Sequence, residues 1–326
     1  MNEFNNRVFG CAIVKAINAN YNADFTHQPR TLPDGTIYAT DKAFKYSIRH
    51  YLQNHHPNEK IFYYKRLKEN LNPRTLDETY HALFGDYSKM KVEKKKKGGD
   101  TKEEEALDKQ AILKNLLQCL DIRLFGATYA GETNISIHGP VQINHAMNRF
   151  TSGEIYSEQI MSPFRNPEKE GKDEKEASTL GQQSKLREGH YVHHFSVNPQ
   201  NLMALRKLAE NALGLTDDDI AKLKEAMRCG VTYYDSASKA GTDNELLLWV
   251  QLQESSRTVL PVFTEFVQVS RENGMVHIDF GALSKVIEKI SEQVQQIEVY
   301  FNPENTQFKG LPESIRKYEI TTAKAL

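Results

Sequence analysis

The stretch RVFGCAIVKAI at residues 7–17 decides how the fold begins. Its apolar and β-branched residues are typical of a buried strand. The next segment, NANYNADFTHQPRTLPDG (18–35), is rich in Asn, Asp, Pro and Gly and is predicted to be a long loop. A helix is predicted over DKAFKYSIRHYLQN (41–54), because its apolar residues fall on one stripe and Thr40 or Asp41 is suited to cap it.

The rest of the chain mixes strands and helices without regular alternation. Strands are predicted at 121–130, 134–148, 190–197, 245–254, 276–281 and 297–302, and helices at 106–118, 199–213, 216–229 and 282–294. This irregular order predicts an α+β fold with a largely antiparallel sheet rather than a doubly wound parallel one.

Two segments differ from this core in composition. The first is the insertion 58–105, whose end, SKMKVEKKKKGGDTKEEE (88–105), is predicted to contain a disordered Lys/Glu-rich loop. The second, 151–189, has few apolar residues and is predicted to project from the core. The core is therefore expected to comprise 7–55, 106–150 and 190–302, within one domain that spans 1–326.

Composition excludes several classes of protein. The 326 residues include 42 Lys+Arg and 43 Asp+Glu, a formal net charge of -1, and aromatic residues make up 10%. The aromatic content argues against wholesale disorder. No apolar run approaches the roughly 18 residues of a membrane span, and the N-terminus lacks the pattern of a signal peptide. The three widely spaced cysteines, Cys11, Cys119 and Cys229, argue against a disulfide framework and for the cytoplasm.

Common catalytic motifs are absent from the sequence: it contains no GxGxxG after the first strand, no GxxxxGK[ST], no HExxH and no GxSxG. His190, His193 and His194 lie close together, but on a strand His190 and His194 share one face and His193 points to the other. A metal site would need an Asp from elsewhere, so ordinary strand-face histidines are the favoured interpretation.

The basic and amide residues carry a stronger signal. Lys42, Lys45 and Arg49 recur along one side of the predicted helix, where they either follow a phosphate backbone or form a solvated helix face. The run IHGPVQINHAMN places Gln142, Asn144 and His145 near a Gly-Pro bend. Such hydrogen-bonding groups suit sugar and phosphate contacts, although a plain strand and turn accounts for them equally well.

Taken in order, these segments resemble a known family. IVKAINANYNADF with its downstream PR, TDKAFKYSIRHYL, DIRLFGATYA and GPVQ resemble the backbone subunit of the CRISPR Cascade complex, the Cas seven family, in its type I-B subtype. VNP, LTDDDIAKLKEAMRCG and DNELLLWVQ continue the likeness to about residue 255. Two departures are the INHAMN segment, which replaces a Phe-Gly run of the family, and the Lys/Glu-rich insertion.

The resemblance implies an RRM-like (ferredoxin-like) core with large insertions that form a palm, fingers and a thumb. Such a subunit binds guide crRNA along its sugar–phosphate backbone, lines up with further copies of itself and presents the guide for pairing with target DNA. The resemblance also implies other Cascade subunits as partners: a Cas five-type subunit, the large subunit and the small subunit. No cofactor, metal or catalytic residue is implied.

The resemblance also indicates residues. Lys45 and Arg49 match the helix positions that hold the guide, and the 151–189 excursion matches the thumb. The further RNA-binding candidates are Lys42, Arg30, Asn18, Arg123, Gln142, Asn144, His145, Ser238 and Lys239, and the thumb candidates are Met161, Phe164 and Arg165. The sequence lacks the aromatic signature of an ordinary RRM, so the base-stacking surface of that fold is not expected.

Two other functions remain open at this point. Type III relatives of the family cut target RNA with a loop aspartate, and Asp24, Asp34 and Asp41 lie in roughly that region. This alternative is a metal-dependent endoribonuclease. The other is an adaptor that shares only the core. A guide-holding role is favoured, because a subunit that accepts any guide must contact phosphate and sugar and leave the base edges free.

Overall fold

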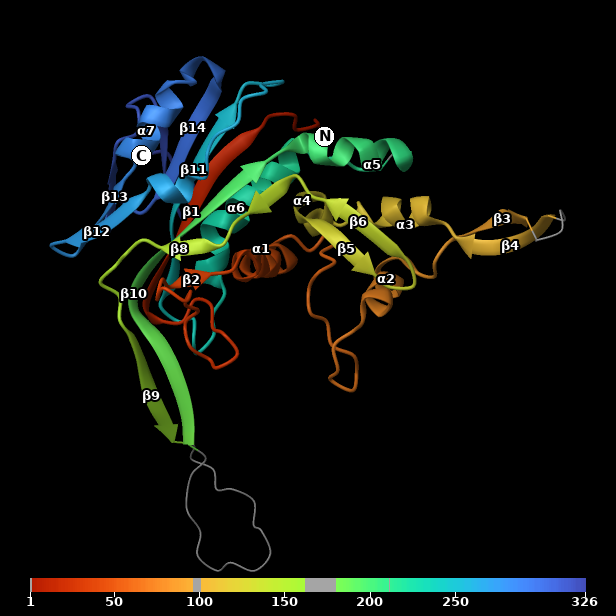
Figure 1. Cartoon of the computed structure of the whole chain (residues 1–326), viewed down its shortest axis with the longest axis horizontal. Coiled ribbons are helices and arrows are strands. Elements are labelled where there is room, and N and C mark those ends of the chain that lie inside the picture. The colour runs from red at the N-terminus through yellow and green to blue at the C-terminus, as the bar shows by residue number, and fades with distance from the viewer. Residues whose placement is uncertain (1, 96–100, 162–179, 211) are drawn as a thin grey trace, which may run out of the picture.

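A large, mainly antiparallel sheet organises the chain (Figure 1). The computed structural model describes residues 2–95, 101–161, 180–210 and 212–326. The sheet has nine strands in the order β16-β14-β11-β1-β10-β8-β2, with β7 and β9 also paired to β10. They are β1 (Val8–Ala19), β2 (Tyr38–Ala39), β7 (Val141–Ile143), β8 (Ala146–Asn148), β9 (Ile155–Met161), β10 (Leu180–Val197), β11 (Thr242–Leu252), β14 (Val294–Phe301) and β16 (Arg316–Glu319). The α+β class is confirmed.

Strand β1 lies at the centre of this sheet. It pairs antiparallel with β10 on one side and β11 on the other, and Val8–Ala16 is buried throughout. Both faces of a central strand are covered by other elements, which explains its nearly unbroken apolar sequence. The strand predicted at 7–17 is therefore confirmed, with slightly shifted ends.

Two helices cover one face of the sheet. They are α1 (Asp41–His55) and α6 (Asp217–Tyr233), and their apolar sides join the β1 residues Val8, Ala12 and Val14 in one core. Thr40 caps α1 by accepting a hydrogen bond from the backbone of Ala43, and a capping box formed with Thr216 starts α6. The helix α1 matches its predicted range closely, whereas α6 continues through Gly230, where the sequence predicted its end, to Tyr233.

The other face carries a second core. Here α7 (Gly281–Glu288) and a three-stranded sheet pack against the odd-numbered residues of β1, such as Cys11 and Ile13. The small sheet consists of β12 (Gln268–Glu272), β13 (Met275–Asp279) and β15 (Thr306–Lys309). Short 3-10 helices, η2 (Phe263–Phe266) and η3 (Ser291–Gln293), complete this side. The helix predicted over 282–294 is thus split into α7 and η3.

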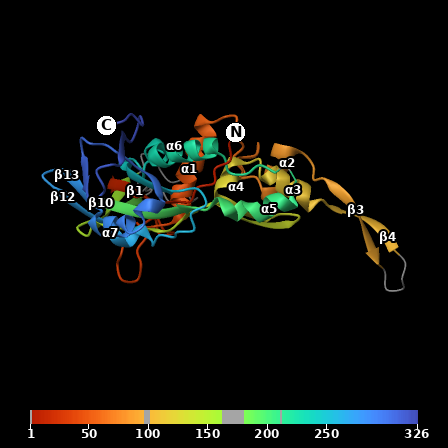
Figure 2. The same cartoon turned by 90° about the horizontal axis from the view of Figure 1, so that it is seen from above.

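A third core forms a side unit beside the large sheet (Figures 1 and 2). Its elements are α2 (Leu76–Phe84), α3 (Lys109–Leu116), α4 (Leu120–Phe125), β5 (Gly126–Ala130), β6 (Asn134–His138), η1 (Pro199–Leu202) and α5 (Met203–Leu208). The helix predicted over 199–213 is therefore a 3-10 turn followed by one short helix. Among the described residues, no helix combines the length and apolar character needed to cross a bilayer.

Two hairpins extend away from these cores (Figure 1). One is formed by β9 and the first half of β10 and corresponds to the predicted excursion 151–189. The other consists of β3 (Lys89–Lys95) and β4 (Thr101–Leu107). Most of the segment predicted to contain a disordered loop thus forms two paired strands, in which lysines of β3 face glutamates of β4 and opposite charges stabilise the pair. Residues 96–100, between the strands, lie outside the described residues, so the prediction of a disordered loop is untested there.

The segment 121–130 is the clearest difference from the sequence prediction. Its first half is the helix α4, and only Gly126–Ala130 forms a strand. A short run whose residues are all buried does not reveal its period, so a strand and a helix look alike in sequence. Gly126, with a φ of 78°, ends the helix, and a Cβ there would lie 2.1 Å from the carbonyl oxygen of Ile137. Glycine is therefore required at this turn.

The helix α4 places Arg123 inside the protein. The side chain is 5% exposed and its guanidinium donates to the Asp219 carboxylate, with Nη2 2.7 Å from Oδ1 and Nε 3.1 Å from Oδ2. Its Nη1 donates to the carbonyl oxygens of Leu117 and Gln118. This bidentate pair joins α4 to the first turn of α6.

Replacing Arg123 with Ala is expected to lower the free energy of unfolding by about 3–5 kcal/mol, because the buried Asp219 carboxylate loses its partner. A matched control is Arg206→Ala, which breaks a more exposed pair with Glu3 and is expected to cost less than about 1 kcal/mol. Urea unfolding of both variants measures the difference. Equal losses in the two variants would contradict the structural role of Arg123.

Candidate nucleic-acid interface

The Asn-rich loop after β1 fixes the start of α1. Asn22 Oδ1 accepts hydrogen bonds from both the backbone nitrogen and the hydroxyl of Thr40, each 2.9 Å long. Thr40 in turn caps α1 through Ala43. The loop therefore determines the direction in which the first turn of α1 presents its side chains.

The first two candidates on α1 differ in their surroundings. Lys45 Nζ lies 3.0 Å from Asp41 Oδ2 and 5.6 Å from the centre of the Phe125 ring, and its side chain is 13% exposed. Lys42 is exposed and makes no ion pair with any described residue. Burial raises the pKa of Asp41, but Lys45 and His145 lower it overall, so Asp41 stays ionised beside Lys45.

Arg49 is held by a buried carboxylate. Its Nε lies 3.0 Å from Oδ2 of Asp121, a residue that is 0% exposed and also accepts the backbone N–H groups of Phe62 and Tyr63. The guanidinium carbon is 5.1 Å from the centre of the Phe125 ring. Its two terminal nitrogens make no hydrogen bond to the described residues. Arg49 is therefore fixed at one end and free to bind a further acceptor at the other.

A second group of candidates meets at the base of the β9–β10 hairpin. Lys239 Nζ donates to the carbonyl oxygen of Tyr21 and lies 5.7 Å and 5.8 Å from the ring centres of Tyr21 and Tyr234. Burial lowers the pKa of Lys239 to about 8, and no carboxylate among the described residues pairs with it. A phosphate group would supply the missing negative charge.

Asn18 and Ser238 lie beside Lys239. Asn18 has a φ of 49° and accepts a hydrogen bond from the Tyr156 hydroxyl of β9. The Ser238 carbonyl oxygen accepts from the backbone of Asn20, which itself donates to the Ser184 carbonyl oxygen of β10. Hydrogen bonds thus join the end of β1, the 235–241 loop and the base of the hairpin.

The remaining candidates fall into two groups. Gln142 and His145 are exposed, and His145 lies 3.5 Å from Asp41, next to the cationic start of α1. Arg30 is half-buried, and its guanidinium carbon lies 6.0 Å from the centre of the Phe25 ring. Asn144, in contrast, accepts from the backbone of His194 and the ring of His193, so its polar groups serve the fold.

Several sequence candidates are not part of this surface. Arg123 is engaged in the buried pair with Asp219, and its assignment as an RNA contact is not retained. Met161 ends β9, while Phe164 and Arg165 lie outside the described residues.

The three loop aspartates considered for RNA cleavage have local partners. Asp24 accepts from the Thr26 and Gln28 backbone, and Asp34 accepts from the Thr36 backbone. Asp41 pairs with Lys45. Each carboxylate therefore stabilises its own turn or helix start, and hydrogen bonds in these turns lower the pKa of Asp24 and Asp34.

A cluster of aromatic side chains on α1 was missed by the sequence analysis. Tyr46 and His50 lie one turn apart on α1, and their rings meet Tyr64 and, from the end of α6, Tyr234. The i, i+4 spacing of Tyr46 and His50 could have indicated a shared face. Tyr64 and Tyr234 come from other parts of the chain, and nothing in the sequence around them indicates that their rings reach α1.

Comparison with known proteins places this arrangement in a family. The family model described as CRISPR-associated protein Cas7 matches residues 6–300. The chain belongs to the Cas7 family. Among curated proteins, none is significantly similar to it in sequence.

Two solved structures share the fold of this Cas7 chain. A chain of a "CRISPR RNA-guided surveillance complex, pre-nicking" aligns with a TM-score of 0.55 and 16% identity, over 96% of both chains. A chain of a "CRISPR RNA-guided surveillance complex" aligns with a TM-score of 0.50 and 14% identity, over 96% of this chain and 94% of the other. At these identities the likeness concerns the fold.

The three neighbouring histidines of this Cas7 chain all make contacts within the fold. His190 lies between the Glu245 and Glu188 carboxylates, and His193 contacts the Tyr21 hydroxyl while its ring stacks on Phe44. His194 accepts from the backbone of Phe263. Within the described ranges, no group of three His, Cys, Asp or Glu side chains is arranged to bind a metal. It is the internal contacts of His190, His193 and His194 that agree with the interpretation of ordinary strand-face histidines.

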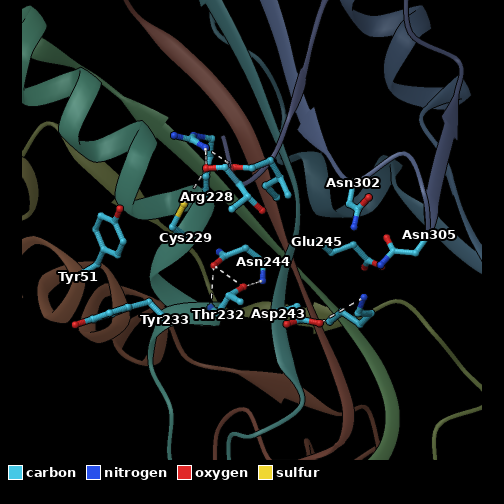
Figure 3. A pocket seen from close by; sticks show the side chains of 13 residues that line it. Tyr51, Arg228, Cys229, Thr232, Tyr233, Asp243, Asn244, Glu245, Asn302 and Asn305 are labelled. Atoms are coloured by element: carbon cyan, nitrogen blue, oxygen red, sulfur yellow. Dashed lines mark hydrogen bonds and ion pairs between the residues drawn. The ribbon is translucent and has the colours of Figure 1, made fainter. Parts of the chain in front are cut away.

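A polar hollow of about 460 Å³ opens near Glu245, between α6 and the ends of β11 and β14 (Figure 3). Two cations line it: Lys15 lies 3.6 Å from Asp243, and Arg228 donates to the carbonyl oxygens of Ile320 and Thr321. Like Lys239, Arg228 has no carboxylate partner among the described residues, but its Nη1 already serves two backbone acceptors.

His190 is expected to make stability depend on pH. Burial lowers the pKa of His190, but Glu245 and Glu188 outweigh it and raise the pKa above the usual 6.5. Protonated His190 therefore stabilises the folded state fully below pH 6.5, and this contribution is lost as pH rises through the raised pKa. Denaturant unfolding across this pH range should show a falling free energy of unfolding, and His190→Gln should flatten that slope.

His194→Gln is the matched control, because burial lowers the pKa of His194 to about 4 and keeps its ring neutral over the same range. Its slope should equal that of the unaltered protein. A slope that survives in His190→Gln would contradict the assignment.

Proposed function

We propose that this chain is a non-catalytic backbone subunit of a type I CRISPR surveillance complex, Cascade, of subtype I-B. It binds guide crRNA along the sugar–phosphate backbone and presents it for pairing with target DNA in antiviral defence. The match of the Cas7 family model to residues 6–300 is the observation that carries this proposal.

The cationic groups of α1 and of the hairpin base support RNA as the ligand. Lys42 and Lys239 have no carboxylate partner among the described residues, and the terminal nitrogens of Arg49 are free of hydrogen bonds there. Positive groups of this kind favour phosphate and carry no base specificity. That is what a subunit needs if it accepts every guide sequence and leaves base edges free.

The strand order supports a ferredoxin-like, or RRM-like, core. The strands β11-β1-β10-β8 lie side by side and run antiparallel to their neighbours. In sequence, α1 follows β1 and α6 lies between β10 and β11, and both helices pack on the same face. This is the β-α-β-β-α-β pattern of that fold. We treat residues 1–326 as one Cas7-type domain with this core.

The insertions fit the remaining parts of such a subunit. We assign the β9–β10 hairpin as the base of the thumb and the side unit with β3–β4 as the fingers. The roles of Met161, Phe164 and Arg165 as thumb residues stay predictions. Further copies of this chain are the proposed neighbours along the guide. The Cas five-type, large and small Cascade subunits are the other partners, in the cytoplasm.

Removing the two central cations should weaken guide binding. Lys45→Ala combined with Arg49→Gln keeps a donor for the buried Asp121 but removes two positive charges. We expect less crRNA in the purified complex, and a salt slope of binding that falls by roughly 0.7 for each lost phosphate contact with single-stranded RNA. Filter binding at several salt concentrations measures the slope.

The matched control is Lys285→Ala with Lys289→Ala, which removes the same charge at α7 on the opposite face of the sheet. It should retain crRNA and the original slope. If both double variants behave alike, the surface of α1 does not hold the guide.

The non-catalytic role has its own test. The assembled complex is incubated with RNA complementary to its guide and with Mg²⁺ or Mn²⁺. We expect intact RNA, because Asp24, Asp34 and Asp41 are engaged by their own turns and by Lys45. Regularly spaced cuts would instead establish the metal-dependent endoribonuclease.

A further inference from the structure

The exposed side of α1 carries a second stripe of residues beside its cations. Tyr46 and His50 follow one another at i, i+4, on the open side of the helix next to Lys42 and Arg49. The buried residues of α1, such as Phe44 and Ile48, point the other way, into the core. The cationic and aromatic stripes therefore share one surface.

Three rings of this surface are nearly parallel. Tyr46, His50 and Tyr64 have centroids 6.2, 6.5 and 5.9 Å apart, and their planes differ by only 12°, 18° and 29°. A hydrogen bond of 3.0 Å between His50 Nδ1 and the Tyr64 hydroxyl fixes two of them. None of the three side chains is buried. They make an ordered aromatic surface rather than a set of mobile side chains.

Other side chains border this surface. Tyr234, at the end of α6, meets Tyr46 and His50 edge-on, with centroids 5.2 and 4.9 Å away. Lys239 lies over Tyr234, and Arg66 lies 5.9 Å from the Tyr64 ring. Cations thus flank the rings from the helix, from the 235–241 loop and from the segment after α1.

Nucleobases fit this combination better than a protein partner. Single-stranded nucleic acids are bound by aromatic side chains on which bases stack, next to cations that follow the phosphates. Protein–protein interfaces are, in contrast, poor in lysine, whereas Lys42 and Lys239 border these rings. Burial and the nearby His55 lower the pKa of His50, which keeps its ring neutral and able to stack.

We propose that Tyr46, His50 and Tyr64 form a stacking platform for bases of the bound guide strand, beside the cations that hold its phosphates. The inference rests on the proposed function and adds to it a contact with the base faces. Stacking engages the face of any base and leaves its pairing edge free, so it is compatible with guides of every sequence.

The test compares RNA with and without bases. Binding of the complete protein is measured for a single-stranded RNA of mixed sequence and for the same backbone made of abasic nucleotides. Tyr46→Ala and Tyr64→Ala should each weaken binding of the normal RNA by roughly 5- to 150-fold and leave binding of the abasic strand unchanged. Tyr46→Phe, which keeps the ring, should bind normal RNA like the unaltered protein.

The salt dependence of RNA binding distinguishes stacking contacts from charge contacts. The alanine variants should keep the salt slope of the unaltered protein, whereas Lys45→Ala should lower it. If an alanine variant fails to fold, 2-aminopurine placed along the RNA replaces it: stacking on the unaltered protein should quench this base beyond the level of the free strand, and no added quenching overturns the platform.

Other results would also overturn the inference. Normal RNA affinity in the alanine variants, or an equal loss for the abasic strand, excludes stacking. Normal affinity with fewer copies of the protein per RNA would show that the rings contact a neighbouring subunit. If only the cation variants lose RNA and the alanine variants of the rings do not, the platform is excluded but the proposed function stands. If the unaltered protein binds no RNA, the proposed function itself is wrong.

Discussion

The arrangement of the cationic surface of α1 depends on the contacts made by the Asp121 carboxylate. It is 0% exposed, and it accepts hydrogen bonds from Arg49 of α1 and from the backbone of Phe62 and Tyr63. A buried charge is tolerated only when such partners surround it. Since Asp121 belongs to α4, this one carboxylate joins the helix layer of the large sheet to the side unit and sets the position of Arg49.

This contact changes what the cations of α1 can do. The sequence predicted either a phosphate-binding stripe or a solvated helix face, but Lys45 and Arg49 are only 13% and 15% exposed and have acidic partners. An arginine fixed at Nε loses little further conformational entropy when its terminal nitrogens bind a ligand. Preorganised cations of this kind hold a phosphate in a defined place, which a mobile solvated lysine does not.

Sequence alone predicted the elements that have local signals. The strand β1 and the helices α1 and α6 were predicted because their signals are local: the spacing of apolar residues along each element, and capping residues such as Thr40 and Thr216 at the helix starts. The partners of the charged side chains were not predictable in this way. Asp121 is 72 residues from Arg49, and Asp219 is 96 residues from Arg123, so only the fold distinguishes an arginine whose terminal nitrogens make no hydrogen bond to the described residues from one whose nitrogens are engaged inside the protein. The rings of Tyr64 and Tyr234 reach Tyr46 for the same reason.

The misassigned segment and the misassigned arginine have one cause. On a strand, residues two apart point to the same face, so Asp121 and Arg123 would lie together and Arg123 would point toward the same surface as Arg49. On a helix, two residues advance by about 200°, so the two side chains point to opposite sides. Because α4 is a helix, Asp121 reaches Arg49 of α1 while Arg123 reaches Asp219 of α6. The D-x-R spacing therefore joins one short helix to both helices that cover the sheet, and each charge is neutralised where it is buried.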